Sequence, residues 1–427
     1  MNFNVPVASL KSLCLLVADC PHSTPLWTDH GVVVLRNQNI KKGRLDLSNP
    51  SFTDEKHYQS RVKRAKPQQG DLVITREAPM GEVCQIPAGL KCCLGQRQVL
   101  LRPDPKKVDS GYLLYALQAP FLQHQIGWNE GTGSTVSNLR IPVLEELSVP
   151  TPPIHIQKEI SSTLSALDDR ITLLRETNKT LEAIAQAIFK SWFVDFDPVR
   201  AKMEGRQPEG MDEATAALFP DSFEESELGL VPKGWTYSTV GKSFRLIMGQ
   251  SPPGDTYNAS GSGLPFYQGR TDFGFRFPSK RMFCVRPSRV SVPGDSLVSV
   301  RAPVGDVNMA IEECCIGRGV AAVRHPLNYR GFTFYTLKAL NTQFQKYDSE
   351  GTVFGSINKK DFEALKVILP GDETLRLFDE TTKHLDKRIE VNEEAIRTLT
   401  SLRDTLLPRL ISGQLRLPEA QEQIENA

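Results

Sequence analysis

Two long stretches of the chain repeat apolar residues with the period of a coiled coil. In residues 160–192 the apolar positions alternate four and three residues apart, with Asn178 at one of them. Residues 378–410 repeat the same spacing and have Asn392 in the series. Each stretch has 33 residues, which is about 50 Å of helix at a rise of 1.5 Å per residue. Sustained heptads predict that the two helices pair with each other, although two amphipathic helices packed on separate domains are the alternative.

An antiparallel pairing of these helices predicts a contact between their asparagines. In a twofold-symmetric pair the numbers of facing residues add to a constant, and matching the ends of the two stretches gives 570. Asn178 then faces Asn392 in the seam, where an amide needs a polar partner and can fix the register. A register shifted by one heptad would place each asparagine near a solvated edge instead.

The segments before each helical stretch read as globular parts of mixed structure. Short apolar runs such as residues 31–36 and 295–300 lie between Gly, Pro and Asn residues, which is typical of strands bounded by turns. Residues 111–126 and 331–347 each have the pattern of a helix. The expected fold class is α+β, with two similar domains separated by two long helices that form an antiparallel coiled coil.

Four motifs occur twice, in the same order along the chain. "REAPMGEV" from Arg76 resembles "RAPVGDV" from Arg301. The pairs "CCLGQR" and "CCIGRG", "GTGSTVSN" and "GTVFGSIN", and "LDDRI" and "LDKRI" follow at offsets that fall from 222 to 220 to 218. This period is far too long for a solenoid repeat. It indicates a duplicated domain, in which each copy is a globular part followed by a helical part.

Length and composition narrow the class of protein. A chain of 427 residues suggests two or three domains, and 40% hydrophobic residues are enough for cores. No apolar run is long enough for a membrane span and no secretory signal is visible, so we expect a cytoplasmic protein. The 8 cysteines include no Cys-x-x-Cys pair, so the sequence gives little support for a zinc site or a redox function.

The formal net charge of +1 hides a segregation of charge along the chain. Residues 1–153 have a net charge of +4 and residues 231–370 of +8, whereas residues 154–230 have −7 and residues 371–427 have −4. Two basic blocks separated by acidic ones favour two surfaces for a polyanion. Ordinary variation of surface charge is the alternative, and it is enough to explain the net charge of +4 in residues 1–153.

Several motifs resemble catalytic signatures but lack an essential residue. "TVGKS" ending at Ser243 has Thr236 where a phosphate-binding loop needs glycine, and the chain has no G-x-G-x-x-G. The Pro-Pro pairs after Ser251 and Thr151 are not followed by the aromatic residue that amino-methyltransferases use. "GDSL" from Gly294 has no Asp-x-x-His partner for its serine. We therefore expect no catalytic residues, no metal site and no cofactor.

The remaining candidates are residues suited to binding DNA. Asn and Gln can pair bidentately with adenine and Arg with guanine, and Lys and Arg also neutralise phosphates. Solvated loops over an aromatic core would have a similar composition. The first copy offers Arg36, Asn37, Gln38, Lys41, Lys42, Arg44, Arg61, Lys63 and Arg64, and the second offers Gln268, Arg270, Arg276, Lys280 and Arg281 among six aromatic residues.

Two further kinds of candidate come from the repeated motifs. Arg76 and Arg301 begin the repeated Ala-Pro motif and complete the set of expected DNA contacts. The small-residue segments 131–135 and 351–352 have backbone N–H groups suited to phosphate, although such segments are more often simple loops.

Together these motifs resemble one known family. "SWFVDFDPVRAKMEG" from Ser191, "LGLVPKGW" up to Trp235, "VRAPVGDV" from Val300, "IGRGVAAVR" from Ile316 and "LRDTLLPRLISGQL" from Leu402 are similar to motifs of the specificity subunits of type I restriction–modification systems. They cover both halves of the chain. One departure is the first domain, which begins with "MNFNVPVASLKSL" and has no "PKGW"-like start.

The resemblance implies a function without catalysis in this chain. Two target-recognition domains would each read one half of a bipartite site in double-stranded DNA, while separate methyltransferase subunits and a motor-nuclease subunit would perform the chemistry. A stand-alone DNA-binding regulator with a coiled-coil element is the alternative. The expected segments are recognition domains at 1–153 and 231–370, helical spacers at 154–200 and 371–415, a linker at 201–230 and a tail at 416–427.

Overall fold

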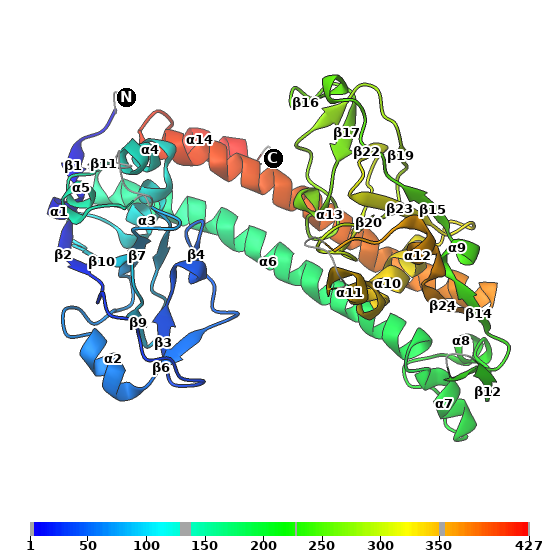
Figure 1. The fold of residues 1–427 in the computed structure, drawn as a ribbon. Helices are drawn as coiled ribbons and strands as arrows, with labels where there is room; N and C mark the ends of the chain where they lie inside the picture. Colours follow the sequence, from blue (N-terminus) through cyan, green and yellow to red (C-terminus); the bar gives the residue numbers. More distant parts are fainter. Residues whose placement is uncertain (1–3, 129–137, 227–228, 350–354, 426–427) are drawn as a thin grey trace. The chain divides into compact units, whose positions relative to one another are not determined.

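The structure is a computed structural model that describes residues 4–128, 138–226, 229–349 and 355–425. The chain divides into two compact units, residues 1–173 with 395–427 (unit 1) and residues 174–394 (unit 2). Two helices of 40 residues, α6 (Ile154–Phe193) and α13 (Asp372–Ile411), each contribute one segment to each unit (Figure 1). The expected class, α+β with two similar domains and two long antiparallel helices, is confirmed.

Unit 1 is built on an antiparallel sheet of four strands in the order β2 (Cys14–Asp19), β10 (Gln98–Pro103), β7 (Leu72–Thr75) and β8 (Val83–Gln85). A second sheet contains β6 (Ser51–Thr53), β3 (Val32–Leu35) and β9 (Cys92–Leu94), and β3 runs parallel to β9. Two small pairs complete the strands, β1 (Val7–Ser9) with β11 (Ser148–Pro150) and β4 (Ile40–Lys41) with β5 (Arg44–Leu45). The helices are α1 (Leu10–Leu13), α2 (Glu55–Arg61), α3 (Ser110–Gln118), α4 (Pro120–Trp128), α5 (Ile141–Glu145) and α14 (Leu417–Glu425).

Unit 2 repeats this plan. Its four-stranded antiparallel sheet has the order β15 (Arg245–Met248), β23 (Val320–Arg324), β20 (Ser296–Ser299) and β21 (Val307–Met309), and β14 (Thr236–Thr239) pairs with β24 (Lys366–Leu369). The second sheet contains β16 (Tyr257–Asn258), β18 (Phe283–Cys284), β17 (Leu264–Tyr267), β22 (Cys314–Ile316) and β19 (Val290–Ser291), and β17 runs parallel to β22. The helices are α9 (Val240–Ser243), α10 (Arg330–Ala339), α11 (Asn341–Ser349) and α12 (Lys359–Ala364).

A connecting region between α6 and β14 has no counterpart among the described residues of unit 1. It contains α7 (Asp197–Met203), α8 (Glu213–Ala217) and the hairpin of β12 (Phe223–Ser226) and β13 (Gly229–Pro232). Despite its different sequence, the start of unit 1 folds like the "PKGW" start of unit 2, because β1–α1 and β14–α9 both consist of a strand followed by one helical turn.

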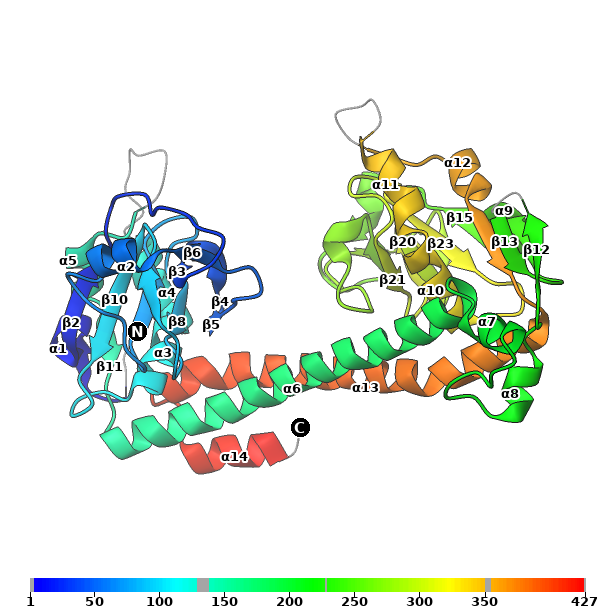
Figure 2. The same ribbon diagram turned by 90° about the horizontal axis from the view of Figure 1, so that it is seen from below.

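In each copy, two consecutive helices replace the single helix expected from the sequence. Residues 111–126 divide into α3 and α4 because Pro120, which has no backbone N–H to donate, begins a new helix. Residues 331–347 divide at Leu340, where α10 ends. In unit 2, α10 packs between the four-stranded sheet and the long helices (Figure 2), where Phe332 and Tyr335 join Phe189 of α6 in one hydrophobic core.

The predicted seam of the long helices is largely buried. In unit 1, Ile160 and Leu164 share a core with Leu406 and Leu410. In unit 2, Asn178 and Asn392 are 0% and 2% exposed, and Nδ2 of Asn392 donates to Oδ1 of Asn178 at 2.8 Å. The side-chain contact expected from the antiparallel register is therefore present. Nδ2 of Asn178 also donates to Oε1 of Glu393 at 2.9 Å.

Candidate nucleic-acid interface

The polar residues singled out in each copy lie at the end of a strand. A short 3₁₀ turn follows β3 in unit 1 and β17 in unit 2, and we call residues 36–39 and 268–272 the strand-end turns. A side chain at the end of each turn fixes its shape. Oδ1 of Asn39 accepts the backbone N–H of Arg36 at 2.9 Å, and Oδ2 of Asp272 accepts that of Gln268 at 2.9 Å. Each strand-end turn is thus closed by a bond from its first backbone N–H to a side chain, three residues later in unit 1 and four residues later in unit 2, and the exposed residues of the two turns differ.

In unit 2 the strand-end turn forms one wall of a basic pocket of about 650 Å³. Gln268, Arg270 and Arg301, all expected to bind DNA, line this pocket together with Arg318. All four side chains are exposed. The structure therefore brings three sequence-predicted residues together from two separate motifs. A cluster of three guanidinium groups and one amide has donors and acceptors suited to phosphates and base edges.

Arg318 was missed by the sequence analysis, although it lies in the repeated "CCIGRG" motif. It is flanked by glycines that pack against the strand-end turn. A Cβ on Gly319 would come within 2.3 Å of the carbonyl oxygen of Gln268, so a side chain cannot be accommodated there without moving the backbone. The glycine thus lets the Arg318 segment approach the strand-end turn closely. A basic residue between two glycines after a buried strand is the signal that would have identified it.

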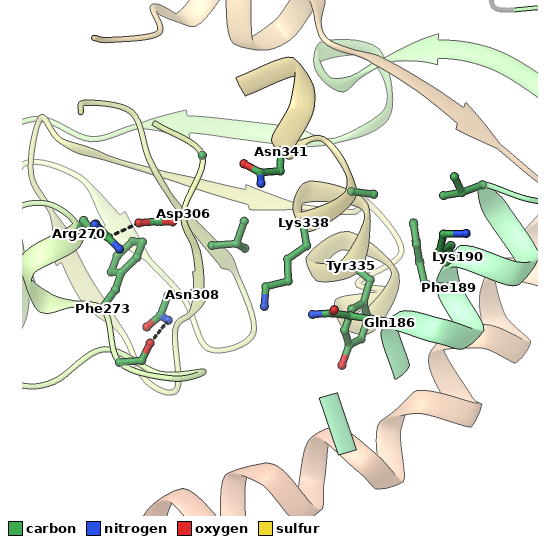
Figure 3. A pocket seen from close by; sticks show the side chains of 15 residues that line it. Gln186, Phe189, Lys190, Arg270, Phe273, Asp306, Asn308, Tyr335, Lys338 and Asn341 are labelled. Atoms are coloured by element: carbon green, nitrogen blue, oxygen red, sulfur yellow. Dashed lines mark hydrogen bonds and ion pairs between the residues drawn. The ribbon is translucent and has the colours of Figure 1, made fainter. Parts of the chain in front are cut away.

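A second cavity, of about 620 Å³, is also lined by Arg270 and Phe273 (Figure 3). Its remaining walls include Lys338 of α10, Asn341 of α11 and Gln186 of α6. Arg270 forms an ion pair with Asp306 of the repeated Ala-Pro motif. The basic pocket and this cavity therefore share the strand-end turn as a common wall.

The strand-end turn of unit 1 also presents polar side chains. Arg36 and Gln38 are exposed, while Nδ2 of the half-buried Asn37 donates to the carbonyl oxygen of Glu77 at 2.5 Å. The guanidinium of Arg36 lies 5.4 Å from the ring centroid of Trp27, whose side chain is 46% exposed. The sequence analysis missed Trp27, which no periodic pattern distinguishes. Lys41 and Lys42, which follow this turn in the sequence, are exposed, and so are Lys63 and Arg64, which follow α2.

Two arginines that were expected to contact DNA are buried instead. Arg61 is 7% exposed, and Nη2 donates to the carbonyl oxygens of Leu94 at 2.9 Å and Gly95 at 3.0 Å. Arg276 is 1% exposed and forms an ion pair with Asp386 at 2.7 Å. The predicted DNA contacts of Arg61 and Arg276 are therefore wrong, because both guanidinium groups are buried and bonded to other groups of the protein.

Arg76 also has a structural role. Its Nη1 lies 2.9 Å from Oδ1 of Asp19, and its Nε donates to the carbonyl oxygen of Leu139 at 2.9 Å. Arg301 is exposed, whereas Arg76 is largely buried, because the two arginines do not occupy equivalent positions in the two units. The Thr75 and Ser299 hydroxyls make the same bond, to the carbonyl oxygens of the cis prolines Pro79 and Pro303. Counting from these residues, Arg76 corresponds to Val300 and Arg301 to Glu77.

The remaining predicted residues are ion-paired. Arg44 contacts Asp168 of α6, and its side chain is 34% exposed. Lys280 pairs with Glu312 and Arg281 with Asp272, and both cations stay about half exposed. The segments 131–135 and 351–352, considered as phosphate-binding loops, lie outside the described residues.

The described residues include no group of three or more potential metal ligands, and none of their helices is long and apolar enough to span a membrane. Burial raises the pKa of Cys92 and of Cys314 to about 12, so these thiols stay protonated near neutral pH. The features that distinguish the site are therefore its exposed guanidinium, ammonium and amide groups.

Fold and site together define a protein with two copies of one α+β domain, each with a polar strand-end turn, on a pair of long helices. The family model for the type I restriction modification DNA specificity domain matches residues 23–183 and 232–400. The chain therefore belongs to the family of type I restriction–modification specificity proteins.

Two curated relatives and one solved structure agree with this assignment. A putative type I restriction enzyme specificity subunit (MjaX) of Methanocaldococcus jannaschii is 29% identical, over 91% of this chain and 88% of the relative. The HindI specificity subunit of Haemophilus influenzae is 27% identical, over 67% and 73%. The crystal structure of a type I system S subunit from M. genitalium is 19% identical, covers 96% of both chains and has a TM-score of 0.58, which supports the fold.

Proposed function

We propose that this chain is the DNA-reading subunit of a type I restriction–modification complex. Each unit reads one half of a bipartite duplex site through its strand-end turn and the neighbouring basic residues. In the complex, separate methyltransferase subunits and a motor-nuclease subunit bind this chain and perform the chemistry. The recognition domains are proposed to correspond to residues 1–153 and 231–370.

The observation that carries this proposal is the repeated strand-end turn with different exposed residues in each copy. In both units a side chain accepts the backbone N–H of the first residue of the turn, while Arg36 and Gln38 in unit 1 are replaced by Gln268 and Arg270 in unit 2. Amide and guanidinium groups discriminate adenine from guanine in the major groove. One scaffold can therefore read two different half-sites.

The test is to sequence modified adenines in a host that carries this chain with its methyltransferase subunits. Methylation confined to one bipartite sequence, and lost when the gene for this chain is deleted, is the expected result. Methylation that persists without this chain would contradict the proposal. A chain that binds one DNA site tightly without any partner would instead fit a stand-alone regulator.

A further inference from the structure

In unit 2, an arginine just after the strand-end turn is anchored on the long helices. Nη1 of Arg276 lies 2.7 Å from Oδ1 of Asp386 of α13, and Nη2 donates to the Tyr335 hydroxyl at 2.8 Å. The Tyr335 hydroxyl in turn donates to Oδ1 of Asp386 at 3.1 Å. Glu182 of α6 lies 3.4 Å from Nη2 of Arg276 and also pairs with Lys338. This anchor joins the strand-end turn, α10 and both long helices.

Unit 1 contains an anchor of the same kind. Nη2 of Arg44 donates to the carbonyl oxygen of Asp168 at 2.7 Å and lies 3.3 Å from its Oδ1, while Nη1 contacts the Thr172 hydroxyl. The Tyr115 hydroxyl of α3 donates to Oδ2 of Asp168 at 2.8 Å. Arg403 of α13 lies 2.6 Å from Oδ1 of the same carboxylate.

The members of the two anchors occupy equivalent positions in the repeat. Asp168 and Asp386 are related by the offset of 218 of the long helices, and both tyrosines lie on the helix that follows the four-stranded sheet. Strands β3 and β17, aligned through their parallel partners, differ by 232 residues. The same offset relates Arg44 to Arg276, so both arginines lie nine residues after the end of their strand, β3 or β17.

A close approach of glycine holds the tyrosine-bearing helix against the long helices. A Cβ on Gly111 of α3 would come within 2.2 Å of the Ser161 hydroxyl of α6. A Cβ on Gly331 of α10 would come within 2.5 Å of the Thr382 hydroxyl of α13. A side chain at either glycine would force the facing hydroxyl to move, so the tyrosine-bearing helix lies close against a long helix in each unit.

Burial limits the positions that the Arg276 side chain can adopt. The Arg276 side chain is 1% exposed, and its guanidinium also stacks 4.0 Å from the ring centroid of Phe334. A buried guanidinium needs a partner for its charge, so it permits few positions of the backbone that carries it. Both Nη atoms of Arg276 are bonded, while its Nε has no hydrogen-bond partner among the described residues. Arg44 is 34% exposed, and its position is restricted by its bonds to Asp168 and Thr172.

We propose that Arg44 and Arg276 are positioning residues for DNA reading. Each holds the strand-end turn of its own unit in a fixed position over the long helices of that unit, without touching DNA. This inference rests on the proposed function, since it concerns how accurately each turn meets its half-site. Displacements of about 1 Å are enough to misalign bidentate hydrogen bonds, which need defined distances and angles.

Unit 1 offers the sharper test because its anchor tolerates the loss of one member. In Arg44→Met the Asp168 carboxylate keeps Arg403 and Tyr115 as partners, whereas removal of Arg276 would leave Asp386 with the Tyr335 hydroxyl and no cation among the described residues. Asp168→Asn removes the charge that faces Arg44 from the helix side, and with it the ion pair of Asp168 with Arg403. The control is Lys106→Met, which removes one exposed positive charge from the same unit.

The experiment uses the chain assembled with its methyltransferase subunits and the bipartite site found by methylome sequencing. Dissociation constants are measured for that duplex and for duplexes with single changes in the unit 1 half-site. We define discrimination as the ratio of the dissociation constants of the changed and the original duplex. We expect Arg44→Met and Asp168→Asn each to lower this ratio by about tenfold. The double variant should discriminate no worse than either single one, and Lys106→Met should discriminate like the original chain.

Two results would overturn the positioning role. Unchanged discrimination in both variants would show that the anchor does not matter for reading. Uniformly weaker binding with a salt slope reduced by about one would make Arg44 a phosphate contact. If Arg44→Met does not assemble, Arg44→Lys, which cannot bond Asp168 and Thr172 together, replaces it under the same criteria. A starting complex that discriminates no sequence would refute the proposed function instead.

Discussion

Arg270 and Arg276 lie six residues apart, yet their side chains have opposite environments. Arg270 is 59% exposed in a surface ion pair with Asp306, whereas Arg276 is 1% exposed in a network of carboxylates and aromatic rings. An exposed ion pair adds little to stability and is exchanged readily for another anion. Only Arg270 is therefore available for a contact with DNA.

Arg270→Ala should weaken binding of the assembled complex to its DNA site by about 1–3 kcal/mol if the guanidinium reads a guanine, with loss of preference at one base pair. The measurement is a dissociation constant for the cognate duplex and for duplexes changed at each position of the unit 2 half-site. Arg286→Ala, in an exposed pair with Asp255, is the control and should bind as before. Equal loss on all sequences with a shallower salt dependence would make Arg270 a phosphate contact.

His325 makes the stability of unit 2 depend on pH. Burial lowers its pKa below the ordinary value of 6.5, and Asp372 only partly offsets this effect. Because the unfolded state binds the proton more readily, the contribution of neutral His325 is complete above pH 6.5 and is lost as the pH falls through the lowered pKa. The urea midpoint of unit 2, followed by the fluorescence of its buried Trp192 and Trp235, should fall between pH 7.5 and 5.

His325→Gln should reduce this fall, because glutamine does not titrate. The exposed His384→Gln serves as the matched control and should keep the full pH dependence of the original chain. An undiminished fall in His325→Gln would assign the effect to other groups.

At the scale of elements, the long helices combine an apolar seam with one polar contact. Asn178, Asn392 and Glu393 form a bonded chain of polar groups in the unit 2 segment of the helix pair. The two asparagines are not equivalent in the repeat, so the duplication does not force them to meet. A bonded amide pair in an apolar seam favours one register over its neighbours.

Asn178→Leu should lower the free energy of unfolding by about 1–3 kcal/mol, because the buried Asn392 amide loses its acceptor. The double variant Asn178→Leu with Asn392→Leu should recover much of this loss, which denaturant unfolding can measure. Thr180→Leu, at an exposed position two residues away, is the control for adding a leucine to α6. A double variant as unstable as the sum of both single ones would indicate that the amides do not act as a pair.

At the scale of the whole molecule, the duplication predicts that half-site reading is modular. Replacing residues 231–370 by the equivalent block of a relative should change only one half of the methylated sequence, because the strand-end turn of unit 1 is untouched. The donor block must have an arginine at position 276, since Asp386 and Glu182 lie outside the block and need it. Methylome sequencing reads the result.

The reciprocal exchange of residues 1–153 is the matched experiment and should change the other half. An exchange that alters both halves while the chain still supports methylation would contradict independent reading. The two exchanges together test the proposed boundaries of the recognition domains.

Features that depend on local periodicity could be predicted from the sequence. The heptads of α6 and α13, the Asn178–Asn392 contact and the duplication all follow from residue spacing, because a helix presents every third or fourth residue on one face. The exposed cluster of Gln268, Arg270 and Arg301 was predicted in part, since polar residues between strands usually reach solvent. The division of the expected helices at Pro120 and Leu340 was missed.

Only the tertiary structure decided which arginines face solvent. Arg44 meets Asp168 across 124 residues, and Arg276 meets Asp386 across 110. Arg61 bonds carbonyl oxygens of a strand more than 30 residues away. The charge of an arginine is the same in a salt bridge and in solvent, so composition cannot distinguish an anchor from a DNA contact. That distinction depends on which carboxylates and carbonyls the fold brings within hydrogen-bonding distance.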